Sequence, residues 1–164
     1  MHDDLIDQLA ATPKALAHLV AEANDARLDA FSEGEWSART LLAHFRDDEY
    51  LCMRVALERM LAESEPIVHF IEGEDWEPTR NRTRDRKETL LADFALQRQA
   101  SLSILRGLRD EDWARTGLRG ESRFTVHQLV KGWLGHDLEH VAQVEAALGE
   151  TLRAVQVRRA RMAD

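Results

Sequence analysis

The sequence has few of the residues that cross-link or interrupt a chain. Its 164 residues include one cysteine, Cys52, three prolines and eight glycines. A single cysteine excludes an intramolecular disulfide, and the scarcity of helix breakers leaves long stretches that favour helix. No apolar run approaches the roughly 20 residues that cross a bilayer, and the acidic start does not resemble a signal peptide. We therefore expect a cytoplasmic protein with no membrane partner.

Basic residues are fewer than acidic residues. The chain has 22 Lys and Arg against 30 Asp and Glu, which gives a formal net charge of −8. Binding to a nucleic-acid backbone requires positive surface, and we interpret the two basic runs, residues 80–87 and 153–161, as solvated charge. We expect no nucleic-acid partner. With 44% apolar residues, a chain of this length is expected to form one domain, residues 1–164.

Helix-forming stretches and capping residues predict four main helices and no strand. The predicted helices cover residues 3–24, 37–63, 85–108 and 125–149, with a short helical tail from 150 to about 162. Ser37 and Thr125 are typical N-caps, Gly149 is a typical stop signal, and Thr12-Pro13 predicts a kink or a fresh start within the first helix. Residues 64–84 form an unusually long connection between the second and third helices. We predict an all-α, antiparallel four-helix bundle.

Three histidines are predicted to face the core of this bundle. His136 and His140 are four residues apart, so they lie about 40° apart on one helix face, and Trp133 shares that face. His44 lies on the apolar stripe of the second helix, beside Leu41. Burying unpaired imidazoles is costly, and a metal ion offsets this cost by using their lone pairs. The pattern predicts one divalent zinc, nickel or iron ion with an open coordination position.

Two other interpretations of these histidines remain open. The rings can form a polar cluster in the core without a metal. The run from His136 to His140 is also close to the His-Glu-x-x-His motif of zinc proteases, in which the glutamate is the general base. Here Asp137 stands in the glutamate position, and its shorter side chain would place the carboxylate differently. We therefore favour the three-histidine site over the protease motif.

Two further residues are candidates for the site. Asp47 flanks the inward stripe of the second helix, where its carboxylate could act as a general base or orient a histidine. An ion pair with Arg46 is the alternative, and for the neighbouring Asp48 we slightly favour an exposed position. Arg98 interrupts the apolar stripe of the third helix and could bind a carboxylate of a cofactor or substrate. Its alternatives are a packed stem with a solvated head or an internal ion pair.

The segments around the histidines resemble the DinB-like (DinB/YfiT) superfamily. Residues 35–49 include Glu-Trp-Ser before the second helix and Leu-Leu-Ala-His within it, and residues 124–144 include His-Asp-Leu-Glu-His. The opening residues, with Leu9 and Thr12-Pro13, are also similar. The resemblance implies a four-helix bundle with a divalent metal on His44, His136 and His140. It also implies a homodimer and, in some members, metal-dependent transfer to low-molecular-weight thiols such as bacillithiol, mycothiol or glutathione.

Two classes of function follow from these predictions. In the first, the protein is an enzyme, and the metal activates a thiol for transfer to a small-molecule substrate or activates water for hydrolysis. In the second, the bundle is a non-catalytic, stress-related protein that binds metal or a partner. A pocket with room beside the metal position would favour the enzyme. A site filled by side chains such as Trp133 or Trp76 would favour the alternative.

Overall fold

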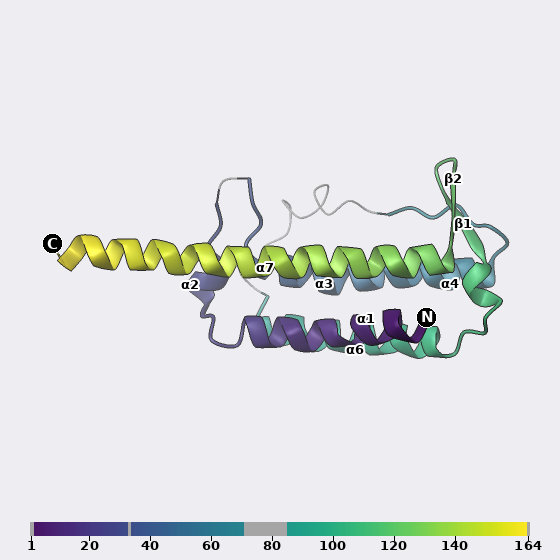
Figure 1. Cartoon of the computed structure of the whole chain (residues 1–164), viewed down its shortest axis with the longest axis horizontal. Coiled ribbons are helices and arrows are strands. Elements are labelled where there is room, and N and C mark those ends of the chain that lie inside the picture. The colour runs from purple at the N-terminus through teal and green to yellow at the C-terminus, as the bar shows by residue number, and fades with distance from the viewer. Residues whose placement is uncertain (1, 33, 71–84, 164) are drawn as a thin grey trace.

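The computed structural model describes residues 2–32, 34–70 and 85–163, with the backbone alone from residue 150 onward. Helices account for most of this chain (Figure 1). The four long helical regions that we predicted are confirmed, and the second consists of α3, a π-helical turn η1, and α4. The elements are α1 (His2–Leu19), α2 (Asp25–Leu28), α3 (Ala38–Asp48), η1 (Glu49–Met53), α4 (Arg54–Ala62), α6 (Lys87–Arg106), the 3₁₀ turn η4 (Asp112–Ala114), β1 (Thr116–Arg119), β2 (Ser122–Thr125) and α7 (Val126–Ala163).

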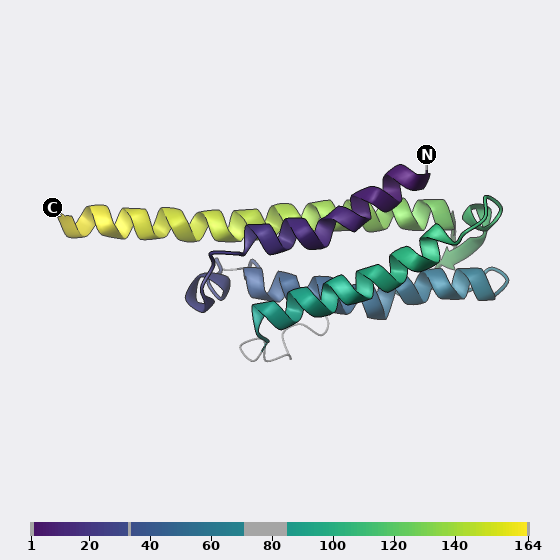
Figure 2. The ribbon, with the colours of Figure 1, turned by 90° about the horizontal axis from the view of Figure 1, so that it is seen from below.

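The long helices form a four-helix bundle in which α1 and α3 each pack against both α6 and α7. α1 and α7 run in the same direction, and α3–α4 and α6 run in the opposite direction (Figures 1 and 2). The last residue of α4 and the first residue of α6 thus lie at opposite ends of the bundle.

Local capping explains where two of the helices begin. The Ser37 hydroxyl accepts a hydrogen bond from the backbone N–H of Thr40 at the start of α3. At the start of α7, the Thr125 hydroxyl accepts from the N–H of Gln128, and the Gln128 side chain accepts from the N–H of Thr125. This reciprocal pair is a capping box. Both predicted N-caps are therefore confirmed.

Two predicted helix features differ from the structure. α1 continues through Pro13 as a single helix, so Thr12 does not start a new one; its hydroxyl instead donates to Asp137 on α7. α7 continues through Gly149 to Ala163, because a glycine weakens a helix without being obliged to end it.

The sequence analysis missed the short helix α2 and a small β-hairpin. β1 and β2 pair in antiparallel register from Thr116–Thr125 to Arg119–Ser122. Gly120 has a φ of +59° at the first position of the two-residue turn, where glycine is favoured. Leu118 also exchanges backbone hydrogen bonds with Pro66 and Val68. Strands of four residues are too short to produce a convincing alternation of polar and apolar side chains, which is why the pattern did not predict them.

The core consists of two apolar clusters along the bundle. One lies around Leu9, Leu57 and Trp133, and the other lies around Leu16, Phe45 and Phe94. In the described part of the chain, no helix combines the length and apolar character that crossing a membrane requires.

Candidate metal centre

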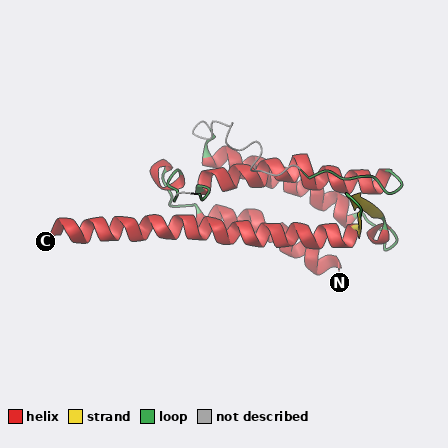
Figure 3. Ribbon diagram, turned by 90° about the horizontal axis from the view of Figure 1, so that it is seen from above, coloured by secondary structure: helices red, strands yellow, loops and turns green. Residues whose placement is uncertain are grey.

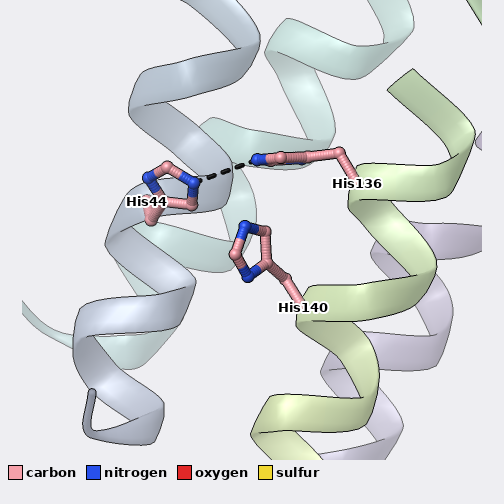
Figure 4. Close-up of side chains that lie close together, drawn as sticks. All are labelled: His44, His136 and His140. Atoms are coloured by element: carbon pink, nitrogen blue, oxygen red, sulfur yellow. Dashed lines mark hydrogen bonds between the residues drawn. The ribbon is translucent and has the colours of Figure 1, made fainter. Parts of the chain in front are cut away.

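The three predicted histidines lie together between α3 and α7 (Figure 4). The Nε2 atoms of His44 and His136 are 3.0 Å apart, and one ligand nitrogen from each of the three rings lies within 4.8 Å of the other two. His44 is buried, and His136 and His140 are half-buried. The i, i+4 spacing places the two α7 rings on one face, as predicted.

The geometry fits a single metal ion. Nitrogen ligands about 2.0–2.1 Å from a metal lie about 2.9 Å apart at octahedral angles and about 3.3 Å apart at tetrahedral angles. The His44–His136 pair already has this separation. Three imidazole ligands leave at least one coordination position for water or substrate, as in catalytic zinc sites. The donor set suggests a divalent transition metal.

The surroundings keep two of the rings in a form that can bind metal. His140 Nδ1 lies 2.7 Å from Gln143 Oε1; when this nitrogen donates to the oxygen, Nε2 is left with its lone pair for a metal. Burial, followed by the charges of His140, His44 and Arg98, lowers the pKa of His136 from 6.5 to about 3. His136 is therefore neutral near pH 7, as a metal ligand has to be.

The shifted pKa of His136 predicts an acid-sensitive fold in the metal-free protein. The unfolded chain takes up a proton on this ring below its ordinary pKa of 6.5, whereas the folded protein resists it until about pH 3. Its contribution to stability is thus complete above pH 6.5 and is lost as the pH falls toward 3, with a slope of up to about 1.4 kcal/mol per pH unit. Urea titrations between pH 4.5 and 7 should show a smaller slope for His136→Leu. Equal slopes in the two proteins would contradict this assignment.

The two neighbouring aspartates at the end of α3 differ in position. Asp48 is buried, and its Oδ2 lies 3.5 Å from His136 Nε2. The Asp47 carboxylate instead faces Arg46, with Oδ1 2.7 Å from Nε and Oδ2 3.0 Å from Nη2. Asp48 rather than Asp47 thus lies beside the histidines, and our preference for an exposed Asp48 was wrong. Its i+4 spacing from His44 was the signal for this position.

Arg98 is at the centre of a buried polar network. Its guanidinium forms two hydrogen bonds to the Asp137 carboxylate, of 2.6 and 3.0 Å, and Nε donates to Glu49 Oε2 at 3.0 Å. Nη1 also donates to the carbonyl of Leu9 at 2.8 Å. The side chain of Arg98 is 2% exposed. Because its N–H groups donate to protein acceptors, Arg98 is not placed to bind the carboxylate of a cofactor. This position differs from our prediction.

A proline explains why the Leu9 carbonyl is available to Arg98. In a helix, the carbonyl of Leu9 would accept from the N–H of residue 13, but Pro13 has no N–H. Arg98 supplies the missing donor. Thr12, one residue earlier, donates to Asp137 Oδ2 at 2.7 Å. The Thr12-Pro13 pair therefore connects α1 to the buried network.

Glu49 has a buried carboxylate that belongs to the same network as Arg98, and the sequence did not indicate this position. Its Oε2 accepts from Arg98 and from Trp133 Nε1, which is 3.1 Å away. Burial raises the pKa of Glu49, and the charge of Arg98 opposes that rise. Glu49 begins the π-helical turn η1, and such turns occur often at functional sites. Sequence spacing does not predict a π-turn, so the inward position of Glu49 had no clear signal.

The histidines open onto a cavity of about 580 Å³. Its walls come from α3, η1, α7 and the β-hairpin. Trp36, which precedes α3, and Phe70, at the end of a described segment, complete them. Trp133 lines the cavity without filling it. The lining residues are Trp36, His44, Asp48, Met53, Phe70, Arg119, Ser122, Phe124, Gln128, Leu129, Gly132, Trp133, His136 and His140.

Fold and site together define a helix-bundle protein with a three-histidine candidate metal centre. Residues 8–144 match the family model of the DinB superfamily, and the chain belongs to this superfamily. Among solved structures, the chain is similar to YfiT from Bacillus subtilis, described as a probable metal-dependent hydrolase with an unusual four-helix bundle topology. The TM-score is 0.84 at 19% identity, covering 92% of this chain and 87% of YfiT; this likeness shows a shared fold. No curated protein matches the sequence significantly.

Proposed function

We propose that the protein is a metal-dependent enzyme that binds one divalent ion through His44, His136 and His140. The observation that carries this proposal is that the three rings open onto a cavity of about 580 Å³. A non-catalytic metal site would more often be closed by protein ligands. Trp133 forms part of the wall, and Trp76, the other side chain that we considered as a plug, lies outside the described residues.

Metal-assisted hydrolysis is the reaction that these residues support best. A bound divalent ion would polarise an electrophilic group and lower the pKa of a water molecule. Asp48, whose Oδ2 lies beside His136, would accept one proton from the attacking water and return it to the leaving group. The water oxygen would bond to the electrophilic carbon as the bond to the leaving group breaks. The description of YfiT as a probable metal-dependent hydrolase supports the same class.

Elemental analysis of protein prepared without an affinity tag tests the metal site. We expect about one equivalent of a transition metal per wild-type chain and less than about a tenth of that in His44→Ala, because two imidazoles hold an ion more weakly than three. His18→Ala, which removes an exposed histidine of α1, should retain the wild-type content. Circular dichroism should show the same helix content in all three proteins. Stoichiometric metal in His44→Ala would contradict the three-histidine assignment.

The homodimer, the low-molecular-weight thiol and the cytoplasmic location remain predictions from the sequence. Transfer to a thiol would use the same residues, with the thiol sulfur in place of the water oxygen and Asp48 as the acceptor of its proton.

A further inference from the structure

The cavity beside the histidines is elongated along α7. Six of its lining residues lie on this helix, from Gln128 to His140. Twelve residues of α-helix span about 18 Å along the axis. The cavity therefore runs from the metal centre toward the beginning of α7, where the β-hairpin lies (Figure 3).

The two ends of the cavity are lined by different polar groups. At one end are the three histidines and the Asp48 carboxylate. At the other end, β1 contributes Arg119 and β2 contributes Ser122. Among the described residues that line the cavity, Arg119 is the only arginine or lysine. Its guanidinium carbon lies 5.1 Å from the centre of the Phe70 ring, a cation–π distance that holds the charge beside the cavity wall.

The wall between the two ends is mainly apolar. Met53, Leu129 and Trp133 line it, and Phe70 and Phe124 continue it to the hairpin, with their ring centres 6.4 Å apart. A wall of this kind binds apolar groups, while a few polar side chains at the ends fix the orientation of the ligand. The volume of about 580 Å³ lies within the range of small-molecule sites, roughly 300–1,000 Å³.

We propose that this cavity binds an elongated, largely apolar small molecule with an anionic end group, and that Arg119 holds the anion. The opposite end of the molecule then lies at the histidines. The levels of Gln128 and His136 on α7 are about 12 Å apart, which sets the approximate separation between the anion and the reacting group. Binding of such a molecule depends on the cavity alone, whereas the position of its reacting group rests on the proposed function.

Gly132 provides a way to block the cavity without disturbing the bundle. It lines the cavity midway between the hairpin and His136, and a Cβ atom added there would meet no other atom within 4 Å. A leucine at this position therefore projects into the cavity. Gly135 lies three residues further along the same helix, also has nothing within 4 Å of an added Cβ, and does not line the cavity. Gly135→Leu is thus a matched control.

Calorimetric titration of the metal-loaded protein with octanoate and with 1-octanol tests the proposal. The two probes share an apolar chain and differ in end-group charge. We expect octanoate to bind about tenfold more tightly than octanol, because a charge-assisted contact adds to the apolar burial. Arg119→Met should weaken octanoate about tenfold and leave octanol unchanged. Gly132→Leu should weaken both probes at least about tenfold, whereas Gly135→Leu should bind as the wild type does.

A carboxylate can also bind a metal directly, so the same titrations are made on His44→Ala. If Arg119 holds the anion, the preference for octanoate persists in this variant. A preference that survives Arg119→Met, or that disappears in His44→Ala, would place the anion at the histidines and overturn the proposal. Failure of octanoate to bind the wild type would overturn it as well. The metal content of each protein is measured separately, so a failure of the metal assignment is distinguished from a failure of the ligand class.

Discussion

Arg98→Met is expected to lower the free energy of unfolding by about 3–5 kcal/mol, the usual cost of removing one partner from a buried ion pair. The substitution leaves Glu49 and Asp137 in the core without their cation. The side chains of these two carboxylates are 0% and 2% exposed, so water cannot replace the guanidinium. The substitution also removes the donor to the Leu9 carbonyl, which has no helical partner because Pro13 lacks an N–H.

Arg59→Met is the matched control for this prediction. Arg59 forms an i,i+4 pair with Glu63 on the surface and donates to the carbonyl of Ile67 at 2.7 Å. An exposed pair contributes less than about 1 kcal/mol and a hydrogen bond about 1 kcal/mol, so the loss should stay well below that of Arg98→Met. The measurement is urea denaturation of each variant. Glu49→Gln, added to Arg98→Met, should recover part of the loss because it removes one uncompensated charge. A loss of under about 1 kcal/mol for Arg98→Met would show that the network contributes little to stability.

The network has a further consequence for the site. Through Arg98, Asp137 and Glu49, it joins the α6, α7 and η1 segments, and Thr12 and Leu9 add α1. Asp137 directly follows His136 on α7. These contacts fix the rotational orientation of this part of α7 about its axis. They therefore also direct His136 and His140 toward His44.

Asp48→Asn is expected to reduce metal-dependent hydrolysis by about 10²–10⁴-fold, the usual contribution of a general base. An asparagine keeps the size of the side chain but cannot take the proton. The measurement is the hydrolysis of p-nitrophenyl acetate by metal-loaded protein, together with the metal content of each variant. An unchanged metal content would separate the loss of a base from the loss of the ion.

Asp47→Asn tests the same chemical change one residue earlier. Because the Asp47 carboxylate is engaged by Arg46 and does not line the cavity, we expect its rate to stay within about threefold of the wild type. If Asp47→Asn lost activity and Asp48→Asn did not, the proton transfer would belong to Asp47, as the sequence had suggested.

Local patterns were sufficient to predict most of the fold and the candidate ligands. Ser37 and Thr125 cap helices because capping depends on residues within one turn. His136 and His140 share a face because their spacing matches the helical period. The position of His44 on an apolar stripe then brought it to the same core. Each of these inferences uses information contained in one helix.

The sequence by itself thus determined the helices, their buried faces and the three histidines that lie between α3 and α7. Only the tertiary structure decided which groups meet across helices: Arg98 with Asp137 and Glu49, Thr12 with Asp137, and Asp48 rather than Asp47 with His136. Helical periodicity gives the direction of a side chain only relative to its own helix. The rotation of each helix, and the neighbour that it faces, depend on how all the helices pack together.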